Sequence, residues 1–262
     1  MDPPSFPATL LANIPVGPYE RIRDDIIAGN LLPDAKLKIR DLRQRYKTGT
    51  SPLREALSKL ATEGLAIQTE NRGFRVAAAD LARYHEMVQA KCWIESIALR
   101  ESIANGSAQW EHGVVIAGYD LEKGILSLEK DRFLYDAKFE LLHKRFHMAL
   151  IAGCNNQEIE RICAQLYDHT ARYRSLYRPK VTRDTRGDEH RQLSAATLAR
   201  DADKAVTLLR DHYLLTAELL CADIECARNA PQPRARSRPS SRRLSIGLAS
   251  SSSQRTRRSA TL

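Results

Sequence analysis

The sequence predicts a mainly α-helical protein in two parts: a small N-terminal domain of three helices and a β-hairpin, and a larger all-helical domain. Apolar residues recur at helical spacing along most of the chain between Tyr19 and Ala227, and only AIQTENRGFRVA has the pattern of two strands and a turn. Charge divides the chain at the same place. Residues 19–76 carry 12 lysines and arginines against 8 acidic residues, whereas residues 77–228 carry 21 against 23.

The N-terminal domain is predicted over residues 19–77, after a Pro-rich segment, residues 1–18, that we expect to be flexible. PYERIRDDIIAGN, KIRDLRQRYKTG and PLREALSKLATEGL each have helical spacing and each stop at a glycine. LLPDAKL is predicted to be a turn-bearing connection between the first two helices, and the hairpin is predicted to turn at Asn71-Arg72-Gly73.

The all-helical domain is predicted over residues 80–228. Asp80 is a suitable cap for a long helix that Asn105-Gly106 would end. Five more helices follow, at roughly 108–129, 136–152, 156–178, 186–199 and 202–227, and Asp201 is a plausible cap for the last. Residues 229–262 contain eight arginines and no acidic residue, and they are too polar to bury a core, so we expect a disordered basic Ser/Arg tail.

Composition narrows the class of protein. No stretch approaches the 18 apolar residues of a membrane span, and the N-terminus lacks the basic start of a signal peptide. Five cysteines without a CxxC pair favour a reduced, cytoplasmic protein. The net charge of +9 is concentrated in the N-terminal domain and the tail, which favours nucleic acid as the partner of the first domain.

Three helices and a hairpin in a basic segment are typical of a winged helix-turn-helix. The short turn YKTGTS would set two helices at an angle, so that the second enters the major groove of DNA. Arg54 is the first choice for reading a base, because a guanidinium binds guanine O6 and N7 together. Other polar groups of that helix are Thr50, Ser51 and Ser58, and phosphate contacts are expected from Arg40, Arg43, Lys47 and Lys59. Arg72, beside Gly73 at the hairpin tip, would reach the DNA backbone or minor groove.

Residues 19–77 resemble the DNA-binding domain of the GntR family of bacterial transcription regulators. The features that match are the connection IIAGNLLPDAKL, the helix SPLREALSKLATEGL and the wing RGFRV. The alternative is a basic three-helix module that binds no nucleic acid.

The stretch HKRFH places His143 and His147 four residues apart, on one face of a helix. Two imidazoles are too few for a tight metal site. His190 and His212 lie on other amphipathic stretches, where single histidines are more often core or surface residues. Lys144 stands where an HExxH zinc peptidase has its glutamate, which argues against metal-assisted hydrolysis.

The all-helical domain, with FH, a later EH and then a further His, resembles the FadR-type effector domain called FCD. In that family an Asp and three histidines commonly bind zinc or another divalent metal beneath a cavity for a small carboxylate. The resemblance implies a metal site of His143, His147, His190 and His212, with zinc the favoured ion. His143 stands at the family's Asp position, and this departure would leave the ligand set without a carboxylate, or would cost the site its metal.

An effector would need cationic or amide groups beside the metal. Lys91 stands where these domains often carry an Arg directed at the cavity, and Asn156, Arg172 and Arg174 offer further groups. Each of them is as readily explained by a solvated helix face. A weaker similarity to regulators induced by carbon starvation implies a small organic acid as ligand.

These observations together predict a DNA-binding transcription regulator, a repressor that a small organic acid releases from its operator. Such proteins usually bind a pseudo-palindrome as a homodimer. The alternative is a metal-dependent enzyme acting on a small carboxylate, fused to a DNA-binding module; no acid/base carboxylate pair, nucleophile elbow or phosphate loop is visible for it, so no catalytic residue is predicted. The basic tail either adds salt-sensitive DNA affinity or is dispensable.

Overall fold

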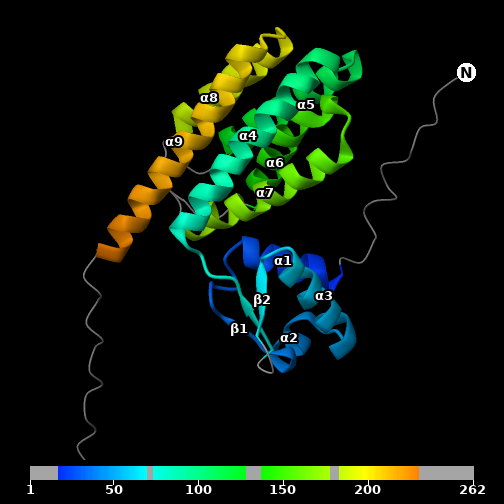
Figure 1. Ribbon diagram of the computed structural model, residues 1–262, viewed down its shortest axis with the longest axis vertical. Helices are drawn as coiled ribbons and strands as arrows, with labels where there is room; N and C mark the ends of the chain where they lie inside the picture. The colour runs from blue at the N-terminus through cyan, green and yellow to red at the C-terminus, as the bar shows by residue number, and fades with distance from the viewer. Residues whose placement is uncertain (1–16, 70–72, 128–136, 178–182, 230–262) are drawn as a thin grey trace, which may run out of the picture. The chain divides into compact units, whose positions relative to one another are not determined.

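The structure, a computed structural model, describes residues 17–69, 73–127, 137–177 and 183–229. Most of the predicted flexible segment (residues 1–18) and of the predicted basic tail (residues 229–262) lies outside the described residues, but Pro18 belongs to α1 and Asn229 to α9, which corrects both boundaries. The N-terminal domain consists of α1 (Pro18–Ile27), β1 (Lys36–Leu37), α2 (Ile39–Tyr46), α3 (Thr50–Thr62), β2 (Ala66–Thr69) and β3 (Gly73–Val76) (Figure 1).

The sheet of this domain has three strands rather than the predicted two. Its order is β1-β3-β2, with both pairings antiparallel, and Leu37 of β1 lies opposite Phe74 of β3. The prediction was wrong for β1, because a strand of two residues has no periodicity of its own and forms only where β3 supplies hydrogen-bond partners. Gly73 opens β3 with a φ of +85°, a left-handed conformation that favours glycine.

The helical spacing of the N-terminal domain buries one face of each helix. Leu53, Leu57 and Leu60 of α3 are fully buried against Ile22 and Ile26 of α1 in one apolar cluster. The opposite face of α3, which the sequence predicts to contact DNA, stays polar and exposed.

The helical domain consists of α4 (Leu81–Asn105), α5 (Ala108–Ser127), α6 (Ala137–Ile151), α7 (Gln157–Tyr177), α8 (Arg183–Leu198) and α9 (Ala202–Asn229). A short 3₁₀ helix, η2 (Ala152–Cys154), follows α6. The predicted cap of α4 is confirmed, since the Asp80 carboxylate accepts a hydrogen bond of 2.8 Å from the Ala82 amide. Asp201 caps α9 in the same way, with a bond of 3.1 Å from the Lys204 amide.

The long helices pack around one apolar core. α4 packs against α7 and α9, and α5 packs against α6 and α8 (Figure 1). Leu99, Phe146, Leu150 and Leu209 belong to this core and are at most 1% exposed. One face of α6, which carries His143, Phe146 and His147, is buried in the interior of the domain. Within the described residues, no helix combines the length and apolar character that crossing a membrane requires.

Candidate functional site

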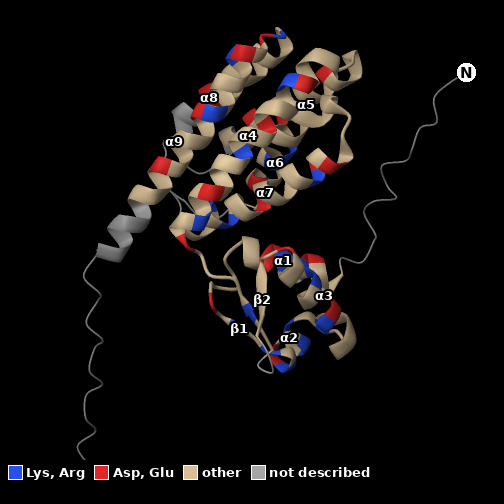
Figure 2. Ribbon diagram, in the orientation of Figure 1, with Lys and Arg blue, Asp and Glu red and all other residues tan. Residues whose placement is uncertain are grey.

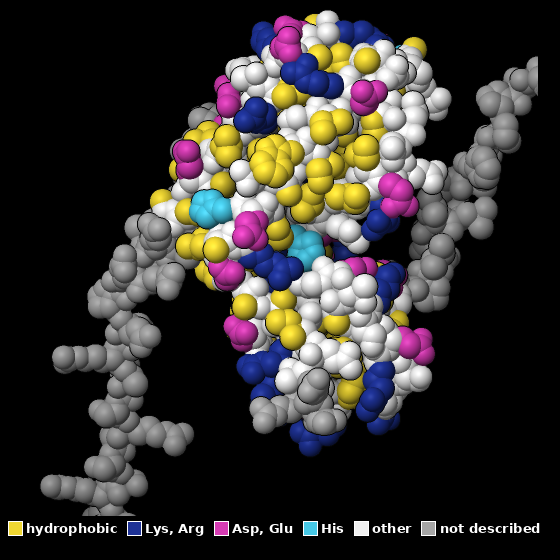
Figure 3. Space-filling view, viewed as in Figure 1, with side chains coloured by type: hydrophobic (Ala, Val, Ile, Leu, Met, Phe, Trp, Pro, Cys, Tyr) yellow, Lys and Arg dark blue, Asp and Glu magenta, His cyan; other side chains and the backbone are white. Residues whose placement is uncertain are grey.

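The residues predicted to contact DNA lie on the surface of the N-terminal domain, with Arg72 outside the described residues. The exposed ones are Arg40, Arg43, Lys47, Thr50, Ser51, Arg54, Ser58, Lys59 and Gly73. Lysines and arginines lie along α2 and α3 (Figure 2), and in the space-filling view they gather at the end of this domain that carries α2 (Figure 3). Lys59 differs from the others, because its ammonium lies 3.8 Å from the centre of the Tyr19 ring on α1.

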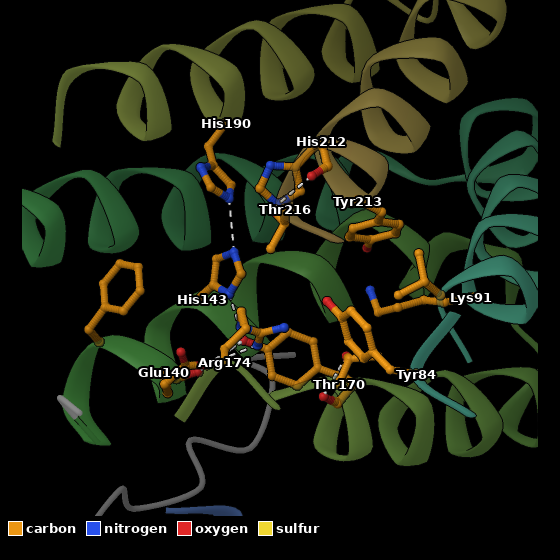
Figure 4. Close-up of a pocket in the computed structure, with 13 residues that line it drawn as sticks. Tyr84, Lys91, Glu140, His143, Thr170, Arg174, His190, His212, Tyr213 and Thr216 are labelled. Carbon is orange, nitrogen blue, oxygen red and sulfur yellow. Dashed lines mark hydrogen bonds and ion pairs between the residues drawn. The ribbon is translucent and has the colours of Figure 1, made fainter. Parts of the chain in front are cut away.

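The four predicted metal-binding histidines meet in the interior of the helical domain. His143 and His147 come from α6, His190 from α8 and His212 from α9. Figure 4 shows three of them, His143, His190 and His212, at the cavity. All four are at most 8% exposed, and one ring nitrogen from each lies within 4.8 Å of the others. The Nε2 atom of His143 is 3.0 Å from that of His190 and 3.1 Å from that of His147.

Burial lowers the pKa of His143 and of His147 well below the usual range, and the neighbouring histidines, Lys91 and Arg174 oppose a positive charge there as well. Both rings are therefore neutral near pH 7, the form that binds a metal. Zinc–nitrogen bonds of about 2.0–2.1 Å place tetrahedral ligand nitrogens about 3.3 Å apart, close to the distances from Nε2 of His143 to those of His190 and His147. A compact set of four imidazoles, with His143 and His147 neutral, fits a divalent ion.

Two buried tyrosines hold the outer nitrogens of the His143 and His147 rings. The Tyr167 hydroxyl is 2.6 Å from Nδ1 of His143, and the Tyr213 hydroxyl is 2.8 Å from Nδ1 of His147. Each tyrosine also donates a hydrogen bond to a glutamate: Tyr167 to Glu140 at 3.2 Å, and Tyr213 to Glu95. Burial, and then the glutamate, raise the pKa of both phenols, so both remain protonated.

The fourth histidine has a direct carboxylate partner. Nδ1 of His212 is 2.7 Å from a carboxylate oxygen of Glu189, and an imidazole held in this way presents Nε2 to a metal. The sequence reasoning missed Glu189 together with both tyrosines and their glutamates. The sequence could have pointed to three of these residues, because they lie close to predicted metal ligands. Glu189 precedes His190, Tyr213 follows His212, and Glu140 lies three residues before His143.

A cavity of about 40 Å³ opens beside the histidines and is lined by His143, His190 and His212. This volume holds about three water molecules, so a ligand larger than a few non-hydrogen atoms has to displace side chains. Polar groups from α4, α7 and α9 also line it, among them Lys91, Thr170, Arg174 and Thr216 (Figure 4).

Lys91 and Arg174 are the two cations of the cavity wall. The Lys91 ammonium is 2.9 Å from the Glu95 carboxylate. A guanidinium nitrogen of Arg174 is 3.0 Å from the Glu140 carboxylate. Burial nevertheless lowers the pKa of Lys91. Nζ of Lys91 and Nε of Arg174 are buried without a well-oriented hydrogen-bond acceptor among the described residues. Buried donors of this kind are costly, and an anion in the cavity would satisfy them.

The other two predicted effector residues lie elsewhere, which corrects the sequence interpretation. Asn156 is exposed and caps α7, because its side-chain oxygen accepts a bond of 3.1 Å from the Ile159 amide. Arg172 donates to the backbone carbonyl of Ala77. Residues two apart on a helix point about 200° away from each other, so Arg172 cannot face the cavity that Arg174 lines.

Comparison with known families and proteins identifies both domains of the chain. Residues 18–76 match the model of the bacterial regulatory proteins of the gntR family, and residues 86–215 match the FCD domain. The chain is 33% identical over 201 residues to the HTH-type transcriptional repressor GlaR of Escherichia coli, covering 75% of this chain and 90% of that protein. It is 34% identical over 201 residues to the uncharacterized HTH-type transcriptional regulator BphR of Paraburkholderia xenovorans, covering 74% of this chain and 80% of the other.

Among solved structures, Escherichia coli McbR/YncC has a TM-score of 0.66 at 16% identity, covering 79% of this chain and 96% of that chain. A GntR regulator from Rhodococcus has a TM-score of 0.63 at 18% identity, covering 78% of this chain and 95% of the other. These similarities support the fold.

Proposed function

Because the chain belongs to the GntR family of bacterial transcription regulators and carries an FCD domain, we propose that it is a repressor released from DNA by a small organic acid. Its relatives are transcription regulators, which leaves the alternative of an enzyme fused to a DNA-binding module without support. The observation that carries the effector proposal is the pair of buried donors, Lys91 Nζ and Arg174 Nε, in the wall of the histidine-lined cavity.

We propose that the four histidines hold one divalent ion, zinc in preference to others. Zinc favours imidazole nitrogen in a site of four ligands, and the site here offers four imidazoles. Such an ion would keep its full charge of about +2, because no carboxylate belongs to the ligand set. That charge would attract the carboxylate of an effector toward the same cavity.

The metal proposal is tested by elemental analysis of tag-free protein, with His147→Ala/His212→Ala as the control. About one ion per chain in the natural sequence, absent from the control, is expected. A metal-free natural protein would contradict the proposal, and the cavity would then have to bind an acid through Lys91 and Arg174 alone.

The effector proposal is tested by DNA binding. Fluorescence anisotropy with the operator would be measured in the presence of mono- and dicarboxylic acids of about two to six carbon atoms. Arg174→Gln should keep its affinity for DNA and lose the response to the acid. Arg161→Gln, an exposed arginine on the same helix, should keep both. An operator complex that no acid changes, in footprints as well as in anisotropy, would contradict release by an acid.

We also propose that the protein is a homodimer that binds a pseudo-palindromic operator. Trp93 and Ile97 on α4 are 61% and 58% exposed, and the space-filling view shows hydrophobic side chains gathered on the face of the helical domain that α4 crosses (Figure 3). Exposed aromatic and aliphatic groups of this kind are typical of interfaces. Trp93→Arg should shift the protein to the monomer in analytical ultracentrifugation, whereas an unchanged sedimentation coefficient would remove α4 from the interface.

A further inference from the structure

Two chains of contacts run from the cavity wall to the histidines of α6. In the first, Lys91 pairs with Glu95, Glu95 accepts from the Tyr213 hydroxyl, and Tyr213 contacts Nδ1 of His147. In the second, Arg174 pairs with Glu140, Glu140 accepts from the Tyr167 hydroxyl, and Tyr167 contacts Nδ1 of His143. We call these chains of contacts the two relays.

The hydrogen-bond roles within each relay follow from chemistry. An ionised carboxylate only accepts hydrogen bonds, so each glutamate takes the single hydroxyl proton of its tyrosine. The phenolic oxygen must then accept from the imidazole, which requires the proton of the neutral ring to be on Nδ1. The lone pair of Nε2 is therefore left in the ring plane.

Those lone pairs meet at the histidine cluster. The Nε2 atoms of His143 and His147 are 3.1 Å apart, a distance at which two unprotonated nitrogens repel each other. A cation between them converts this repulsion into two coordinate bonds. The relays thus favour an arrangement that is unsatisfied without an ion and satisfied with one.

We propose that the two relays position the metal-binding imidazoles, with Tyr167 and Tyr213 as positioning residues and Glu140 and Glu95 as the carboxylates that orient them. The inference rests on the proposed metal site and extends it to residues that do not touch the ion. The ligand set contains no carboxylate, because it consists of four imidazoles. The relays instead place two glutamates behind the tyrosines that contact His143 and His147. Their charge raises the basicity of the rings through the phenols without occupying a coordination position.

The glutamates are shared with the cavity cations. Glu95 is 2.9 Å from Lys91, and Glu140 is 3.0 Å from Arg174. Removing one cation therefore changes the partner of the carboxylate that orients a metal ligand. An acid bound to Lys91 or Arg174 acts on the same carboxylates.

The test is the zinc affinity of full-length protein, measured by competition with a chromophoric chelator. Tyr167→Phe and Tyr213→Phe should each weaken zinc binding by about 10- to 100-fold, and the double variant should weaken it further. Glu95→Gln, whose amide oxygen still accepts from Tyr213, should lose less than Tyr213→Phe. Tyr84→Phe is the matched control, since Tyr84 is also buried and lines the cavity but belongs to neither relay. Affinities of both relay variants within about twofold of the natural protein would overturn the inference.

A second measurement tests the hydrogen-bond roles in the two relays, and it does so even if the natural protein binds no metal. Long-range ¹H–¹⁵N NMR of the metal-free protein distinguishes imidazoles protonated on Nδ1 from those protonated on Nε2. His143 and His147 should carry the proton on Nδ1 in the natural protein, and each should shift toward Nε2 in the variant lacking its tyrosine. Protonation on Nε2 in the natural protein would overturn the relays. An empty site with both rings protonated on Nδ1 would overturn the metal proposal and support the relays.

Discussion

Lys91→Met should destabilise the helical domain strongly, because it removes one partner of a buried ion pair. The side chains of Lys91 and Glu95 are each 3% exposed, and their charged atoms are 2.9 Å apart. At that distance two unit charges attract by about 6 kcal/mol at an effective dielectric constant of about 20, against about 1.4 kcal/mol in water. Removal of one charge leaves the other buried, which typically costs about 3–5 kcal/mol of the free energy of unfolding.

The double variant Lys91→Met/Glu95→Leu distinguishes this cause from lost packing. It removes both desolvation penalties at once, so most of the stability should return, to within about 1 kcal/mol of the natural protein. Arg161→Met is the control on an exposed pair. Arg161 and Glu158 are 57% and 75% exposed, and breaking their contact should cost less than about 1 kcal/mol.

The assay is urea denaturation with a chelator present, followed by tryptophan fluorescence. Both tryptophans of the chain, Trp93 and Trp110, lie in the helical domain, so the signal reports unfolding of that domain. The slope of free energy against urea should be unchanged among the variants. The reasoning is refuted if Lys91→Met costs no more than Arg161→Met, or if the double variant is as unstable as the single one.

Three further predictions concern pH, metal and DNA. Burial lowers the pKa of His143 and His147 in the folded protein, so below about pH 6.5 the unfolded chain binds more protons than the folded one. As the pH falls through this range, the metal-free protein should therefore lose about 1.4 kcal/mol of its free energy of unfolding per pH unit for each ring. Urea denaturation between pH 7.5 and 5 checks this, and a flat profile would contradict it. Zinc at about 100 times its dissociation constant should add about 2.7 kcal/mol to the free energy of unfolding, and a chelator should remove this gain. Calorimetry measures both effects, and the stability of the variant His147→Ala/His212→Ala should respond to neither zinc nor chelator. Arg54→Ala should weaken operator binding by about 1–3 kcal/mol and relax the preference at one base pair, whereas Lys47→Ala should weaken all sequences alike. Binding to a set of operator variants measures both, and a uniform loss for Arg54→Ala would remove it from base reading.

The sequence by itself determined the helices and the division into two domains. Helix bounds follow from local signals, such as the Asp80 cap and the apolar spacing of Leu53, Leu57 and Leu60, which act within a few residues. The resemblance of HKRFH and the later histidines to an FCD domain was enough to name four residues that the structure brings within 4.8 Å.

Only the tertiary structure decided which polar groups surround those histidines. Periodicity says that Arg172 and Arg174 point to different sides of α7, but the packing of α4, α6 and α9 decides which side is the cavity. Tyr167 and Glu140 are 27 residues apart and meet because α6 and α7 pack together. The strand β1 forms for the same kind of reason, since β3 supplies its partners. Local sequence determines which face of an element is apolar, whereas contacts between elements depend on how those faces pack.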